Sequence, residues 1–181
     1  HGGFDDLHAY PERTPLMGYY DEENPTVCDW EIKWALEHGI NCFIHCWYRK
    51  AENAGKPVTV SDLRCGHGLH DALFKARYGK MMKFAIMFEN NPRWGTSDPV
   101  DIVENLMPFW TENYFTRDNY LKIDNKPVVS IYDLGNLFNF HNLVSNNVKE
   151  FWNILACTNL EQVTCYFNLF AIKFGNIFLF E

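Results

Sequence analysis

Three apolar segments, each preceded by a segment with helical spacing, constrain the fold of this chain more than any other feature. They run from Ile40 to Tyr48, from Lys83 to Phe88 and from Pro127 to Tyr132. Continuous apolar runs of this length are typical of parallel strands that helices cover. Because parallel connections cross over in the right-handed sense, the alternation predicts an α/β fold, either a barrel or an open doubly wound sheet.

The helices that we expect before these strands have recognisable ends. Thr26 can cap the first helix, and Gly39 ends it. The second helix covers Leu69 to Tyr78. Asp98 caps the third helix, which begins at Pro99, a favoured first helical position. The sequence has neither G-x-G-x-x-G nor the Walker pattern, which disfavours a nucleotide-binding open sheet.

The length of the chain and its changing composition indicate an incomplete barrel. It has 181 residues, whereas a complete eight-stranded α/β barrel has about 250. We expect residues 1–133 to form the N-terminal part of a partial or truncated (β/α)8 TIM-type barrel. Residues 134–181 are an atypical tail rich in Asn and Phe, which we expect to pack on the same domain. We hypothesise a frameshift or truncation near Asn136, and a natural N-terminus lost before His1.

Charge and composition exclude some classes of partner. The net charge is −7 and Lys and Arg do not cluster, so we expect no nucleic-acid partner. No apolar run reaches the ~18 residues of a membrane span. We interpret the six cysteines mainly as reduced core residues. We expect no cofactor. The sequence leaves the oligomeric state undetermined. It does not determine the compartment either, although the cytoplasm is slightly favoured.

Several segments, taken in order, resemble one known family. They are Pro15-Leu16-Met17-Gly18-Tyr19-Tyr20-Asp21, residues 29–40, Cys46-Trp47-Tyr48, residues 83–90, Trp94 and residues 120–129. In this order they resemble the glycoside hydrolase family 99-like domain, which includes the WbsX-like polysaccharide-biosynthesis proteins. The resemblance covers roughly Pro15 to Tyr132.

The resemblance implies a (β/α)8 barrel that acts on glycans, with endo-acting mannosidases among its hydrolases. It implies that the first barrel strand would precede His1, and that the catalytic carboxylates of the family lie in a Trp/Glu-rich motif on a late strand, which this chain lacks. We therefore expect a carbohydrate-active, glycoside hydrolase-like protein that processes glycans or mannosides, or an inactive fragment of one. The alternative is a non-catalytic glycan-binding module or a glycosyltransferase-like protein of polysaccharide biosynthesis.

Candidate site residues lie where the apolar strands end, because the carboxyl ends of barrel strands form the active site. Glu89 and Asp133 are the candidate catalytic carboxylates, since glycoside hydrolysis uses a carboxylic acid and a second carboxylate. The candidate substrate-binding residues offer aromatic rings and hydrogen-bonding groups that suit sugars; they are Tyr20, Asp21, His45, Trp47, Tyr48, Asn90 and Trp94.

Each of these residues also has a purely structural interpretation. Strand alternation puts His45 and Trp47 on one face, where they could line a pocket or pack in the core. Glu89 could be an exposed loop carboxylate, and Asp133 a turn-forming residue. Tyr19, Tyr20 and Asp21 could line the mouth of the barrel through the first loop, or be loop residues without a role in the site.

Metal binding is a weaker alternative, and we expect no metal site. Cys42-x-x-His45-Cys46 has zinc-like residues, but alternation puts both cysteines opposite His45. The pattern Cys65-x-His67-x-x-His70 lacks a clear fourth ligand.

Overall fold

The computed structural model describes residues 10–91, 98–133 and 136. Within these ranges the chain is a mixed α/β fold built on a parallel sheet, as the helix–strand alternation predicts. The predicted tail, apart from Asn136, and the candidate Trp94 lie outside the described ranges. Among the helices described, none combines the length and apolar character needed to cross a membrane.

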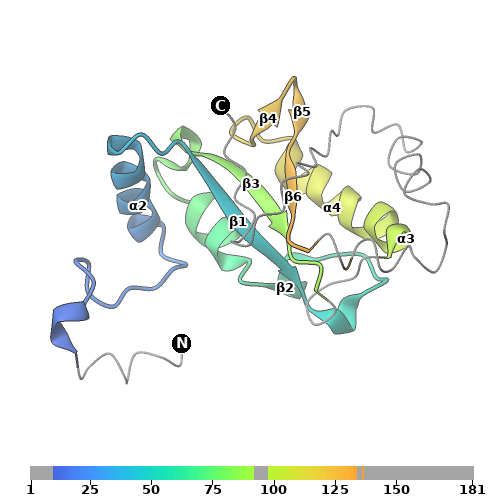
Figure 1. Ribbon diagram of the computed structural model, residues 1–181, viewed down its shortest axis with the longest axis horizontal. Coiled ribbons are helices and arrows are strands. Elements are labelled where there is room, and N and C mark those ends of the chain that lie inside the picture. The colour runs from blue at the N-terminus through green and yellow to red at the C-terminus, as the bar shows by residue number, and fades with distance from the viewer. Residues whose placement is uncertain (1–9, 92–97, 134–135, 137–181) are drawn as a thin grey trace.

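The central sheet has four strands in the order β2-β1-β3-β6 (Figure 1). Its members are β1 (Cys42–Arg49), β2 (Leu63–Arg64), β3 (Lys83–Phe88) and β6 (Val129–Ile131). The strands β1, β3 and β6 run parallel, whereas β2 is antiparallel to the end of β1. The three parallel strands therefore lie side by side in the same order as in the sequence. A separate two-stranded hairpin joins β4 (Lys122–Ile123) to β5 (Lys126–Pro127).

The predicted strand from Lys83 to Phe88 is confirmed with the same bounds. The first strand begins two residues later than predicted and includes Arg49. The third, β6, is shorter than the predicted Pro127 to Tyr132, because Pro127 belongs to the hairpin. The sequence analysis did not predict β2, whose two residues pair with the end of β1.

The first helix is α2 (Pro25–Glu37), and its cap differs from the prediction. The Oδ1 atom of Asn24 accepts a hydrogen bond from the backbone N–H of Thr26 at 2.9 Å. Thr26 is therefore inside the helix and does not cap it, because Pro25 takes the first helical position. Gly39, with a φ of +80°, follows the end of the helix as predicted.

The second and third crossovers are helical but irregular. In the second, the π-helical turn η4 (Gly68–Leu73) is followed by turns and by the 3₁₀ segment η5 (Gly79–Met81), instead of one helix from Leu69 to Tyr78. The third is a succession of four short helical elements: α3 (Pro99–Asp101), η6 (Ile102–Leu106), α4 (Met107–Trp110) and η7 (Thr111–Phe115). Asp98 caps it as predicted, since its Oδ1 accepts the N–H of Val100 at 3.0 Å. Three further 3₁₀ turns are η1 (Pro11–Arg13), η2 (Ala51–Asn53) and η3 (Val60–Asp62).

Helical crossovers cover one face of the sheet and leave residues of the other face exposed to solvent. Trp47 of β1 packs against Trp110 of α4, and Phe84 of β3 packs against Phe74 after η4. This face, with its crossovers, carries the hydrophobic core. The opposite face, which we call the open face, presents Ile44 (41% exposed), Cys46 and Tyr132 (49% exposed) to solvent. The alternation predicted for β1 is confirmed.

Candidate functional site

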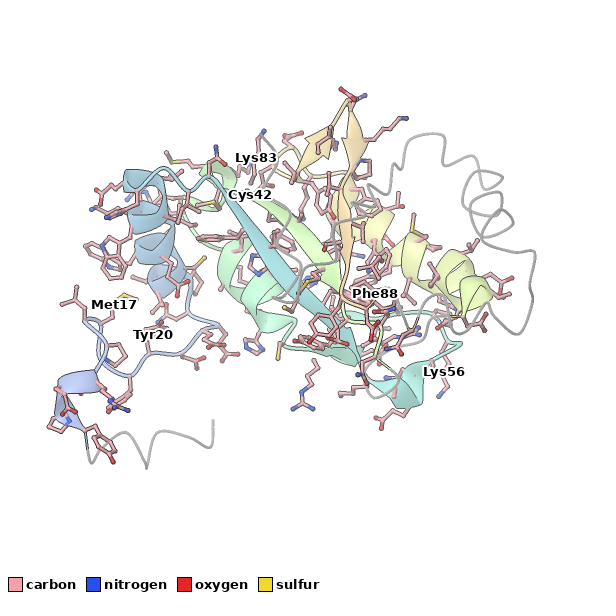
Figure 2. All side chains as sticks on the ribbon, in the orientation of Figure 1. Met17, Tyr20, Cys42, Lys56, Lys83 and Phe88 are labelled. Carbon is pink, nitrogen blue, oxygen red and sulfur yellow. The ribbon has the colours of Figure 1, made fainter. Side chains whose placement is uncertain are left out.

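The carboxyl ends of the three parallel strands meet at one edge of the sheet. Trp47 is in register with Phe88, and Phe88 with Ile131. The residues that follow these positions, Tyr48, Glu89 and Tyr132, are therefore side by side and share the open face. Figure 2 shows this edge at Phe88, at the other end of the sheet from Cys42 and Lys83. The structure thus brings together three strand ends that lie far apart in the sequence.

Glu89 is a buried carboxyl group at the centre of this edge. Its side chain is 6% exposed, and Oε1 accepts the backbone N–H of Asn91 at 2.9 Å. Burial raises the pKa of Glu89, and the nearby charge of Asp133 raises it further, against the lowering effect of the Asn91 hydrogen bond. The site therefore contains a carboxyl group whose pKa lies above its ordinary value.

Asp133 is held in place by the side chain of Asn90. The Nδ2 atom of Asn90 donates to the backbone oxygen of Asp133 at 2.7 Å, and the backbone N–H of Asp133 donates to Oδ1 of Asn90 at 2.9 Å. The side-chain amide of Asn90 thus joins the two chain segments two residues beyond the last registered pair of β3 and β6, Phe88 and Ile131. Oδ1 of Asp133 accepts the N–H of Asn136 at 3.1 Å, the turn-forming contact that the sequence left open.

Tyr48 completes the group on the open face. Its pKa is raised to about 12, first by burial and then by a side-chain hydrogen bond with Cys46; the charges of Cys46, Glu89 and Cys65 add to the effect. Tyr48 therefore lies near enough to Glu89 and Cys65 for their charges to act on its hydroxyl. The sequence analysis missed this influence of Cys65, which directly follows β2, the strand that pairs with the end of β1.

His45 and Trp47 lie on the helix-covered face. The indole Nε1 of Trp47 donates to the hydroxyl of Tyr114 at 3.0 Å, and its ring also contacts Phe88. The ring of His45 packs near Phe84, and burial lowers its pKa to about 4. This packing corresponds to the core interpretation of the two side chains.

Tyr20 and Asp21 belong to the segment before α2. In Figure 2 Tyr20 lies beside α2 and well apart from Phe88 at the end of β3. Oδ1 of Asp21 accepts the N–H of Glu23 at 3.2 Å. The structure does not bring these two residues to the strand ends.

The described cysteines are unpaired, and two of them correct the core interpretation. Cys28 is buried, whereas Cys46 and Cys65 are exposed, because one lies on the open face and the other in a turn with a φ of +60°. Cys42 is half-buried. No group of His, Cys, Asp and Glu side chains that could hold a metal ion occurs within residues 10–91 and 98–133.

A buried ion pair beside the site was also missed. The guanidinium of Arg49 is fully buried and pairs with the carboxylate of Asp101 in α3. A second contact joins Nη1 of Arg49 to Oδ1 of Asp101 at 3.2 Å. The available signal was an arginine at the end of an apolar strand, which needs a partner if the strand is buried.

No known family model matches this chain, and no curated protein matches it either. Among solved structures, the chain is similar to the GH99 endo-alpha-mannosidase from Bacteroides thetaiotaomicron, with 18% sequence identity and a TM-score of 0.42. The alignment covers 66% of this chain and 32% of the mannosidase chain, so this chain spans about a third of the length of that protein.

Proposed function

We propose that this chain is part of a carbohydrate-active (β/α)-barrel protein of the glycoside hydrolase type, whose site lies at Glu89, Asp133 and Tyr48. The observation that carries the proposal is a buried carboxyl group with a raised pKa, beside a second carboxylate, at the carboxyl ends of parallel strands. General-acid catalysis at a glycosidic oxygen requires such a protonated carboxyl group. The ordered sequence segments that resemble family 99 give the same class of substrate.

A barrel is the architecture that the proposal assumes. Consecutive parallel strands are sheet neighbours, and their crossovers pack on one face. In a barrel, helices cover the outside and the other face of the sheet lines the interior. The open face with Ile44, Cys46 and Tyr132 would be that interior, and Glu89 would point to its mouth.

In the proposed reaction Glu89 and Asp133 have different roles because their surroundings differ. The carboxyl group of Glu89 donates its proton to the glycosidic oxygen as the bond between that oxygen and the anomeric carbon breaks. Asp133 is the second carboxylate, and either activates the water that adds to the anomeric carbon or attacks that carbon itself. Its charge also raises the pKa of Glu89.

The remaining side chains of the edge position the reactants. Asn90 fixes the backbone of Asp133, so it is a positioning residue. We propose that the hydroxyl of Tyr48 hydrogen-bonds the sugar, and that the half-exposed ring of Tyr132 stacks on it. Trp94 remains a proposed sugar contact. We give His45, Trp47, Tyr20 and Asp21 no contact with the sugar at Glu89.

The second candidate function is glycan binding without hydrolysis. The observation that favours it is the hydrogen bond from the backbone N–H of Asn136 to Oδ1 of Asp133. This bond gives the Asp133 carboxylate a structural role in a turn, and a protein that binds glycans without hydrolysing them would need that role equally. The two functions differ in turnover, and not in the class of ligand.

The test measures binding and hydrolysis of mannose-containing oligosaccharides by the whole chain and by Glu89→Gln. Gln keeps the size of the side chain and the contact to Asn91 but has no proton to transfer. We expect Glu89→Gln to lower kcat by about 10²–10⁴-fold while the dissociation constant for the oligosaccharide stays unchanged. Glu112→Gln, at an exposed carboxylate of η7, is the matched control and should keep full activity.

Each outcome separates the candidates. Binding by both proteins without turnover by either supports the glycan-binding module. Turnover that survives in Glu89→Gln removes Glu89 as the acid. A glycan array with no bound oligosaccharide contradicts both candidate functions.

A further inference from the structure

A cavity lies at the opposite end of the sheet from Glu89. Its volume is about 440 Å³, and its walls come from the end of η4, from η5, from the start of β3 and from residues 117–119. Lys83 at this end and Glu89 are separated by the length of β3, about 20 Å at 3.3 Å per residue. The cavity is therefore distinct from the proposed glycan site.

The charge of the lining is unusual for this protein. The whole chain carries a net charge of −7. Four cationic residues line this cavity with a single carboxylate, that of Asp118; they are Arg77, Lys80, Lys83 and Arg117. In the part of the chain that the structure describes, none of these four forms an ion pair. Positive charge is thus concentrated in one hollow of an acidic protein.

Arg117 is the fixed member of the group. Its guanidinium carbon lies 3.5 Å from the centre of the Phe74 ring, a cation–π arrangement. Its Nε donates to the backbone oxygen of Asn113 at 2.7 Å. Among the described residues the two Nη groups have no hydrogen-bond partner. Arg117 therefore presents a planar pair of donors whose orientation is already set.

The walls of the cavity are also fixed. The Nδ2 atom of Asn119 donates to the backbone oxygens of Gly79 at 3.1 Å and of Met82 at 2.9 Å. These bonds tie the turn at residues 117–119 to the segment before β3. The backbone of Gly79 lies close to the carbonyl oxygen of Leu73. A Cβ atom at position 79 would lie 2.1 Å from that oxygen. The cavity does not need to form when a ligand arrives.

We propose that this cavity binds the phosphate or sulfate group of a small anionic ligand, with Arg117 as the anchor and Lys80 as a second cation. A guanidinium with two free Nη groups matches the oxygens of such an anion in a bidentate manner. Ammonium groups beside it add charge without a fixed geometry. The volume accommodates a small molecule that carries the anionic group.

The experiment titrates the whole chain with inorganic phosphate, inorganic sulfate and glucose 6-phosphate, each against sodium chloride of equal ionic strength. Amide chemical shifts and Tm report binding. We expect saturable shifts with all three oxyanions that sodium chloride does not produce. Lys80→Gln and Arg117→Gln should each weaken binding roughly tenfold, the loss of one charge-assisted contact. Lys75→Gln, at an exposed lysine that pairs with Asp71 outside the cavity, is the matched control.

The outcomes decide the proposal and its ligand. Tighter binding of glucose 6-phosphate than of phosphate identifies a phosphorylated sugar, whereas equal binding identifies the free anion. A response to phosphate no larger than that to sodium chloride overturns the proposal. An affinity that is unchanged in Lys80→Gln also overturns it, and this variant remains informative if Arg117→Gln does not fold.

Discussion

His45 shows at the scale of one residue how burial fixes a protonation state. Its Nε2 atom is buried without a hydrogen-bond partner among the described residues, and the rings of Phe43 and Phe84 lie against it. Burial therefore lowers its pKa from 6.5 to about 4. A folded pKa below the unfolded one means that the unfolded chain takes up the proton first. Stability from this group is complete above pH 6.5 and is lost as the pH falls toward 4.

We expect His45→Leu to reduce this loss of stability in acid. Between pH 7 and pH 5 the unfolding free energy of the unchanged protein should fall by roughly 1–2 kcal/mol more than that of the variant. Urea unfolding at the two pH values measures the difference. His67→Gln, at a partly exposed histidine, is the control and should behave like the unchanged protein. Parallel pH profiles for His45→Leu and the unchanged protein would contradict the expectation.

At the scale of the element, Gly79 allows the second crossover to pack closely before β3, because it has no side chain. A Cβ at this position would lie 2.1 Å from the carbonyl oxygen of Leu73, so backbone must move to admit it. We expect Gly79→Ala to lower the unfolding free energy by about 3 kcal/mol. Gly68→Ala is the matched control, since its Cβ meets nothing within 4 Å and alanine favours helix. Equal stabilities of the two variants in urea would contradict this account.

The elements that the sequence predicted best are those with clear chemical boundaries. The strand from Lys83 to Phe88 begins at a charged residue and is followed by a polar run, and its bounds are confirmed. The helix expected after Asp98 is broken into short pieces instead. Pro108 lies within it and has no N–H to donate, and the π-helical turn η6 precedes the element that contains it. The local residue pattern thus predicts whether a segment is helix or strand. Whether a helix is regular depends on single residues such as Pro108.

The candidate site divides in the same way. The position of Tyr48, Glu89 and Asp133 at one edge of the sheet follows from parallel strands alone, so the sequence could predict it. The burial of His45 and Trp47 could not be predicted, since alternation separates two faces but does not tell which face helices cover. The electrostatic influence of Cys65 on Tyr48 depends on β2, which is too short to leave a pattern.

Arg49 and Asp101 act at the scale of the whole molecule, because they join the end of β1 to the start of the third crossover. They are 52 residues apart in the sequence. The other described ion pairs are at least partly exposed. Asn105 also donates to Oδ1 of Asp101 at 2.8 Å, and Lys56 offers its backbone oxygen to Nη1 of Arg49 at 3.5 Å. The pair therefore fixes the position of the crossover beside the candidate site.

Breaking this pair on one side should cost more than replacing both partners. Arg49→Met or Asp101→Leu alone leaves one buried charge without its partner, and we expect each to lower the unfolding free energy by roughly 3–5 kcal/mol. The double variant removes both charges, so its loss of unfolding free energy should be well below the sum of the two single losses. Urea unfolding of the four proteins gives the coupling energy as a double-mutant cycle. Additive losses would mean that the two side chains stabilise the fold separately, and that β1 and the crossover are not joined through them.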